Sequence, residues 1–70
     1  MTTTLILDEE TWRLVRKQLG RKDPLRAVVS DMIEDCMTFG TATAEVGEYD
    51  LDAKDVEALD RIVSELDLPS

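Results

Sequence analysis

The chain has no histidine and a single cysteine, Cys36, among its 70 residues. These absences exclude an intrachain disulfide, a zinc site of the Cys/His type and a histidine general base. No hydrophobic run approaches the roughly 18 residues that a membrane span requires. The short run Leu5-Ile6-Leu7 has no basic residues before it, which argues against a signal peptide. We therefore expect a cytoplasmic protein that uses no metal, cofactor or membrane.

Signals of catalysis are missing as well. The sequence has no Gly-rich phosphate loop and no cluster with metal-ligand spacing. Asp50, Asp52 and Asp55 form a faint cation-binding run, but the glycine and terminal glutamate of an EF-hand loop are absent. Cys36 falls on an apolar arc without a histidine to activate it, so we interpret it as a buried structural thiol. We expect that the protein is not an enzyme.

Basic residues are scarce in the second half of the chain. Residues 1–35 carry seven acids and six bases, whereas residues 36–70 carry nine acids and only two bases, Lys54 and Arg61. The C-terminal half therefore holds −7 of the net charge of −8. Such asymmetry indicates that the two halves face different partners, although acidic residues also simply keep small proteins in solution.

The first part of the chain predicts a short strand followed by a helix. Residues 2–7 are an uncharged run rich in β-branched side chains, which favours a strand. Asp8 is a good helix N-cap. Trp12, Val15 and Leu19 follow at helical spacing and form one apolar stripe.

A second helix is predicted to begin at Asp23-Pro24, because Pro is favoured at the first helical position. Its apolar arc is wide enough to be covered from two directions and is expected to supply the core. Gly40 should end this helix. The arc consists of Leu25, Val28, Val29, Met32, Ile33, Cys36 and Phe39.

Residues 40–70 predict an acidic linker and a third helix. Residues 41–46 are compatible with a weak strand, which could pair with residues 2–7, or with an ordered loop. Asp52 and Asp55 form a capping-box-like start. The apolar face that follows could dock on its own domain or on a partner, and it consists of Val56, Leu59, Ile62, Val63 and Leu66.

The fold class expected from these patterns is mainly α with one short N-terminal strand. A lone strand exposes unpaired N–H and C=O groups, and a 70-residue chain buries too little surface for a comfortable monomer. If residues 41–46 form no strand, the strand of a second copy is the obvious partner. The sequence then predicts a homodimer built on an intermolecular two-stranded ribbon.

The order of these elements resembles the ribbon-helix-helix family of DNA-binding dimers over residues 2–39. Residues 4–10 are similar to that family's strand and acidic helix start, and residues 20–25 to its inter-helix turn and second N-cap. The resemblance implies that the paired strands lie in the major groove of operator DNA and that the second helix N-terminus holds a phosphate. The residues that would contact DNA are Thr2, Thr4, Ile6, Arg21 and Lys22.

Many proteins of this family are antitoxins, in which an acidic C-terminal segment neutralises a basic toxin. The resemblance thus implies a transcriptional repressor with two regions: residues 1–39 for dimerisation and DNA binding, and residues 40–70 for a protein partner. The alternative is a small acidic inhibitor of the mobile-element or phage type, or a DNA mimic, that binds a basic protein and no DNA. The expected partner-binding residues are Glu57, Leu59, Asp60, Val63 and Leu66.

Overall fold

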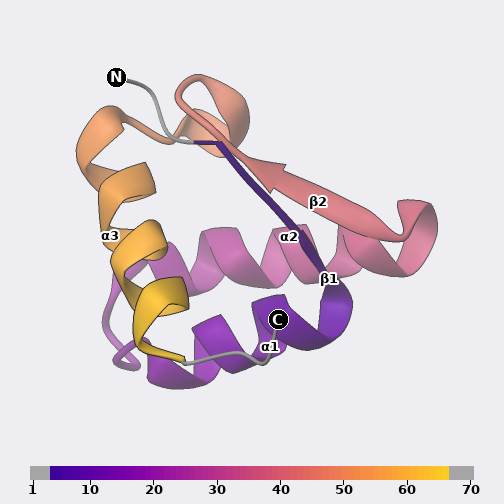
Figure 1. Cartoon of the computed structure of the whole chain (residues 1–70), viewed down its shortest axis with the longest axis horizontal. Coiled ribbons are helices and arrows are strands. Elements are labelled where there is room, and N and C mark those ends of the chain that lie inside the picture. The colour runs from indigo at the N-terminus through magenta and orange to yellow at the C-terminus, as the bar shows by residue number, and fades with distance from the viewer. Residues whose placement is uncertain (1–3, 67–70) are drawn as a thin grey trace.

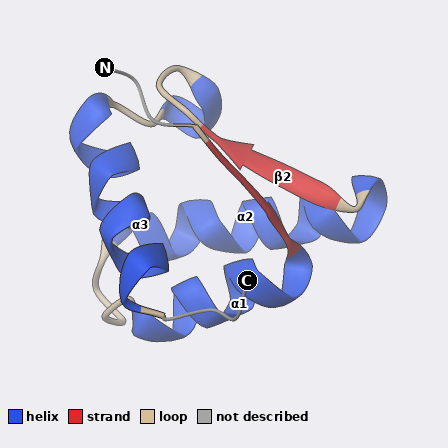
Figure 2. Cartoon of the chain, in the orientation of Figure 1, coloured by secondary structure: helices blue, strands red, loops and turns tan. Residues whose placement is uncertain are grey.

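A computed structural model describes residues 4–66. Its elements are β1 (Leu5–Asp8), α1 (Glu9–Gln18), α2 (Pro24–Phe39), β2 (Thr41–Ala44), a 3-10 turn η1 (Glu48–Asp50) and α3 (Ala53–Glu65). Helices α1 and α2 form a hairpin, the strand pair runs diagonally across α2, and α3 packs against α1 (Figure 1). The fold is mainly helical, with one short two-stranded sheet (Figure 2).

Local capping explains where each helix begins. The Asp8 carboxylate accepts a hydrogen bond from the Thr11 backbone N–H at 2.9 Å and starts α1. Asp23 accepts from the Leu25 N–H at 3.0 Å, with Pro24 at the first position of α2. Asp52 and Asp55 form a reciprocal capping box at α3, which satisfies N–H groups that a helix N-terminus leaves without partners. All three predicted helix starts are confirmed.

The strand β1 finds its partner within the same chain. It pairs antiparallel with β2, so residues 41–44 are a strand and not a loop. The argument for an intermolecular ribbon required an unpaired β1, and this pairing removes its premise. The facing pairs are Leu5–Ala44, Ile6–Thr43, Leu7–Ala42 and Asp8–Thr41.

One hydrophobic core draws on every helix and both strands. Trp12, Val29, Met32 and Leu59 have no exposed surface, and the helix α2 is covered by α1 on one side and β2 on the other, as its wide apolar arc predicted. Residues 1–39 and 40–70 thus share this core. Its buried members are Leu5, Trp12, Val15, Leu19, Leu25, Val29, Met32, Ile33, Cys36, Ala42, Ala44, Leu51, Val56 and Leu59.

Candidate functional site

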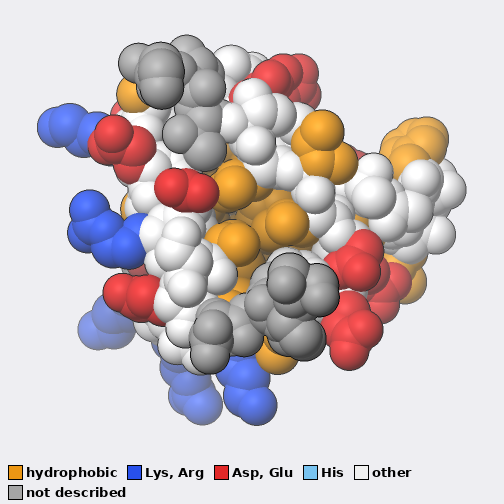
Figure 3. All heavy atoms as spheres, viewed as in Figure 1, with side chains coloured by type: hydrophobic (Ala, Val, Ile, Leu, Met, Phe, Trp, Pro, Cys, Tyr) orange, Lys and Arg blue, Asp and Glu red, His pale blue; other side chains and the backbone are white. Residues whose placement is uncertain are grey.

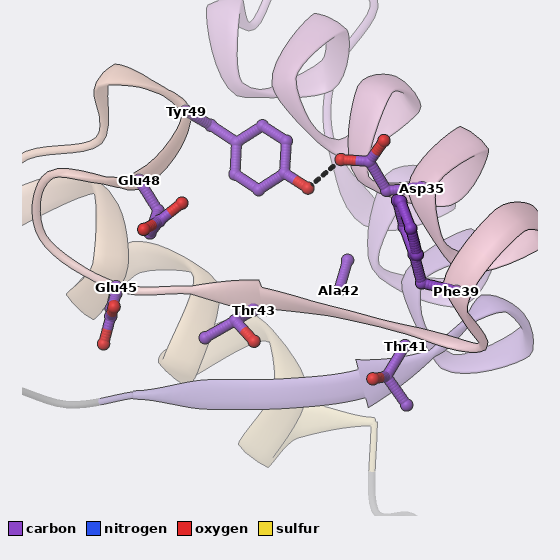
Figure 4. Close-up of a pocket in the computed structure, with 8 residues that line it drawn as sticks. All are labelled: Asp35, Phe39, Thr41, Ala42, Thr43, Glu45, Glu48 and Tyr49. Carbon is purple, nitrogen blue, oxygen red and sulfur yellow. Dashed lines mark hydrogen bonds between the residues drawn. The ribbon is translucent and has the colours of Figure 1, made fainter.

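A groove of about 370 Å³ lies beside β2, on the side away from β1. Figure 4 shows β1 on one side of β2, with the end of α2 and the Tyr49 loop on the other. Its volume falls within the range of small-ligand and peptide sites, roughly 300–1,000 Å³. The lining residues are Asp35, Phe39, Thr41, Ala42, Thr43, Glu45, Glu48 and Tyr49.

Phe39 stands at the rim of this groove and corrects one sequence prediction. The helical spacing placed Phe39 in the buried arc of the second helix, but its side chain is 78% exposed. It is the last residue of α2, and Gly40 immediately reverses the chain with φ of 93°, a backbone conformation that favours glycine. The core lies beneath the preceding turns, so the ring projects beyond it.

The loop between β2 and α3 holds Tyr49 against α2. Tyr49 and Asp50 both have positive φ, at 53° and 59°, a conformation that non-glycine residues seldom adopt. The Tyr49 hydroxyl donates a hydrogen bond to the Asp35 carboxylate, and the Gly47 N–H donates to the Leu51 carbonyl at 3.0 Å. Strained backbone persists where surrounding contacts fix it, and it occurs often at binding sites.

Burial raises the pKa of the Tyr49 phenol to about 12, and the hydrogen bond and negative charge of Asp35 act in the same direction. The phenol is therefore protonated at neutral pH and acts as the donor in this pair. The stability gained by keeping the phenol neutral is fully present below pH 10, the ordinary value. It is lost as the pH rises from 10 through about 12.

Because Tyr49 is the single tyrosine, its titration can be read directly from phenolate absorbance. We expect a midpoint near 12 in the folded chain, and a lower midpoint in Asp35→Asn, which removes the charge that opposes ionisation. Circular dichroism of the same samples reports whether the chain stays folded. A midpoint at 10 with the native spectrum retained would contradict the partly buried Tyr49–Asp35 contact.

The groove is acidic, and basic residues lie elsewhere. Asp35, Glu45 and Glu48 line it, and none of its eight described lining residues is basic. In Figure 3 the Lys and Arg side chains lie along the left and lower edges, with acidic side chains among them, whereas the right-hand side shows acidic and hydrophobic side chains. The groove therefore favours a positively charged ligand.

Two of the basic residues have structural roles. The Arg26 guanidinium donates to the Leu19 carbonyl at 3.3 Å, at the end of α1. The Arg16 guanidinium reaches the Ser30 hydroxyl at 3.4 Å. The one ion pair found among residues 4–66 joins Arg13 to Glu9 at 2.9 Å, and both side chains are substantially exposed.

The predicted DNA-contacting residues do not converge on one surface. Thr2 lies outside the described residues, whereas Thr4 and Ile6 are exposed, with Ile6 at 63%. Arg21 and Lys22 are exposed in the turn at the far end of α1. This helix has ten residues and is thus about 15 Å long, which separates the turn from β1.

The predicted partner-binding residues of α3 divide into two groups. Glu57 is exposed, and Asp60, Val63 and Leu66 are partly buried. Leu59 has no exposed surface, so a partner does not reach this side chain while α3 is docked. The physical reason is that α3 docks on its own domain and inserts Leu59 into the shared core.

Cys36 is buried, as predicted. Its Sγ lies 3.6 Å from the Leu7 carbonyl oxygen. Burial raises the pKa of the Cys36 thiol, and the nearby carboxylates of Asp8, Glu9 and Asp35 raise it further. The protonated thiol is a poor nucleophile and a poor metal ligand.

Within residues 4–66 the structure shows no group of side chains suited to holding a metal ion. None of the helices in that range has the length and apolar character needed to cross a membrane. The groove beside β2 was missed from the sequence. Gly40 and Gly47, which flank residues 41–46, were the available signal that a turn-bounded strand lies there.

No family model, curated protein or solved structure matches this chain. The resemblance of residues 2–39 to the ribbon-helix-helix family therefore stays a prediction from the sequence pattern. The function has to be argued from the surface of the molecule itself.

Proposed function

We propose that this protein is a small acidic binding module that captures a basic protein through the groove beside β2. The observation that carries the proposal is the combination of a concave site, three carboxylates and an exposed aromatic ring in one place. The carboxylates attract lysine and arginine side chains. Phe39 offers the apolar and cation–π contact that such side chains also accept.

The exposed face of the strand pair supports protein binding over DNA binding. Residues facing each other across an antiparallel pair share one side of the sheet, so Asp8 lies on the same side as Ile6 and Thr43. Thr4 donates to the Glu45 carboxylate at 3.4 Å on this side. The described part of this face carries two carboxylates and no basic residue, which opposes a phosphate backbone.

The test is a titration with a synthetic peptide of about eight residues in which lysine alternates with threonine or valine, long enough to overlap a short strand. Wild-type protein should bind it, with affinity falling as salt rises. Glu45→Gln combined with Glu48→Gln should weaken binding about tenfold, since each exposed ion pair contributes up to about 1 kcal/mol. Isothermal titration calorimetry measures both constants.

The matched control is Glu57→Gln combined with Glu65→Gln on α3. It makes the same change in net charge at two exposed positions that do not line the groove. Affinity in this control should stay within about twofold of wild type, because only long-range, screened charge is lost. Equal weakening by both pairs would mean that total charge, and not the groove, governs binding.

DNA binding, with the chain acting as a ribbon-helix-helix regulator, remains a second proposal. The observation in its favour is the alternation along β1, which turns Thr4 and Ile6 outward and Leu5 inward. A homodimer of the ribbon-helix-helix kind would have to form through the edge of β1 that does not pair with β2. A low-salt gel-shift titration of the same preparation with duplex DNA, beside sedimentation to establish the oligomeric state, separates this proposal from the first.

A further inference from the structure

The free edge of β2 borders the groove. Within residues 4–66 the sheet has two strands, so β2 has β1 on one edge and no described strand on the other. In an antiparallel pair, alternate residues direct their N–H and C=O groups away from the partner strand. Part of the backbone of Thr41–Ala44 therefore points to the groove side.

Few hydrogen bonds from the described residues reach the edge of β2 that faces away from β1. No backbone–backbone hydrogen bond within residues 4–66 joins Thr41–Ala44 to a segment other than β1. The Ala42 carbonyl accepts a hydrogen bond from the buried Trp12 indole at 3.1 Å. This bond holds β2 against the hydrophobic core. Unpaired strand edges are templates for another strand.

The side chains around this edge define what could pair with it. Phe39 stands at one end of the groove and Glu45 and Glu48 at the other, with Tyr49 and Asp35 along the side facing β2 (Figure 4). An added strand would turn successive side chains to opposite faces. Lysine or arginine at alternate positions would then meet the carboxylates repeatedly from one face.

We propose that the groove binds an extended, basic segment of a partner protein as a third strand, antiparallel or parallel to β2. The inference rests on the proposed function and specifies its mode. Main-chain hydrogen bonds to β2 supply affinity. The carboxylates of Asp35, Glu45 and Glu48, together with the Phe39 ring, select segments that contain lysine or arginine. This is the mode by which several peptide-binding domains extend an exposed sheet edge.

The experiment uses the full chain and the alternating lysine peptide, with single N-methyl groups placed at successive peptide positions. Each methyl group removes one backbone donor. In a strand, every second residue donates to its neighbour, so affinity should fall about fivefold or more at alternate positions and change little between them. A fivefold loss corresponds to about 1 kcal/mol, a typical hydrogen-bond contribution.

Hydrogen exchange of the protein supplies the second readout. The peptide should slow exchange of amide groups within residues 41–44, while amides of α3 remain as they were. A peptide of the same composition with its lysines grouped together is the control for charge, and it should bind more weakly. Phe39→Ala should weaken binding of the alternating peptide without unfolding the chain, because its ring is largely exposed.

The outcomes separate the mode from the function. Binding that is insensitive to the position of N-methylation, or that leaves residues 41–44 unprotected, would overturn strand addition and leave the basic-protein proposal standing. Protection of these amides in the free protein, with a dimer in sedimentation, would mean that a second copy already occupies the edge, and would also overturn it. Absence of peptide binding would overturn both.

Discussion

Val29→Asp is expected to abolish folding. Val29 lies in the N-terminal half of α2 and has no exposed surface, so the new carboxylate would be buried without a partner. A buried unpaired charge costs several kcal/mol, and a chain of this length has about 4–10 kcal/mol of total stability. Far-ultraviolet circular dichroism and the dispersion of amide NMR signals measure the loss. Ile33→Asp should behave in the same way, since Ile33 is only 3% exposed.

The matched control for this change is Asp31→Asn in the same helix. Asp31 is exposed, and surface substitutions away from caps and networks usually change stability by less than about 0.5 kcal/mol. Its spectrum and denaturation midpoint should match the wild type. A folded Val29→Asp protein would contradict the assignment of α2 as the central element of the core.

Trp12→Ala is expected to have the next largest effect. The Trp12 side chain is fully buried, and its indole N–H donates to the Ala42 carbonyl at 3.1 Å, joining α1 to β2 across 30 residues of sequence. Truncation of a buried aromatic side chain costs about 3–5 kcal/mol. The free energy of unfolding should fall by that amount, measured by urea denaturation followed by circular dichroism.

Trp12→Phe separates packing from hydrogen bonding at this position. Phenylalanine keeps most of the buried ring but cannot donate to Ala42, so the remaining cost should be that of an unsatisfied carbonyl, about 1–3 kcal/mol. In this variant the amides of residues 41–44 should exchange faster than in wild type. A stability equal to that of wild type would show that the bond to Ala42 contributes nothing to holding β2.

Local chemistry in the sequence was sufficient to predict the helices. Each helix start depends on a side chain within three residues of the N–H group that it caps: Asp8, Asp23 and Asp52. The apolar stripes likewise follow from helical spacing alone. Phe39 is exposed, and Val28, Ile62, Val63 and Leu66 are only partly buried, but the other predicted apolar positions of the three helices are buried. These features require no knowledge of which elements lie together.

The candidate site depended on contacts between distant parts of the chain. Tyr49 and Asp35 are 14 residues apart, and no spacing rule connects a loop tyrosine to a helix carboxylate. Phe39 satisfies the helical pattern, yet its exposure is set by where the core ends and the chain reverses at Gly40. The sequence therefore showed that residues 36–70 are acidic. It did not show the groove in which Asp35, Glu45 and Glu48 lie close together.

The sequence by itself determined the three capped helices, their apolar faces, the alternation of β1 and the uneven distribution of charge. Only the tertiary structure decided that β1 pairs with β2, that α3 completes the shared core and that a groove lies beside the free strand edge. The physical reason is that Thr41–Ala44 has weak intrinsic strand preference, because alanine is depleted in strands. Its conformation is fixed by β1, Trp12 and α2, which reach it from far along the chain.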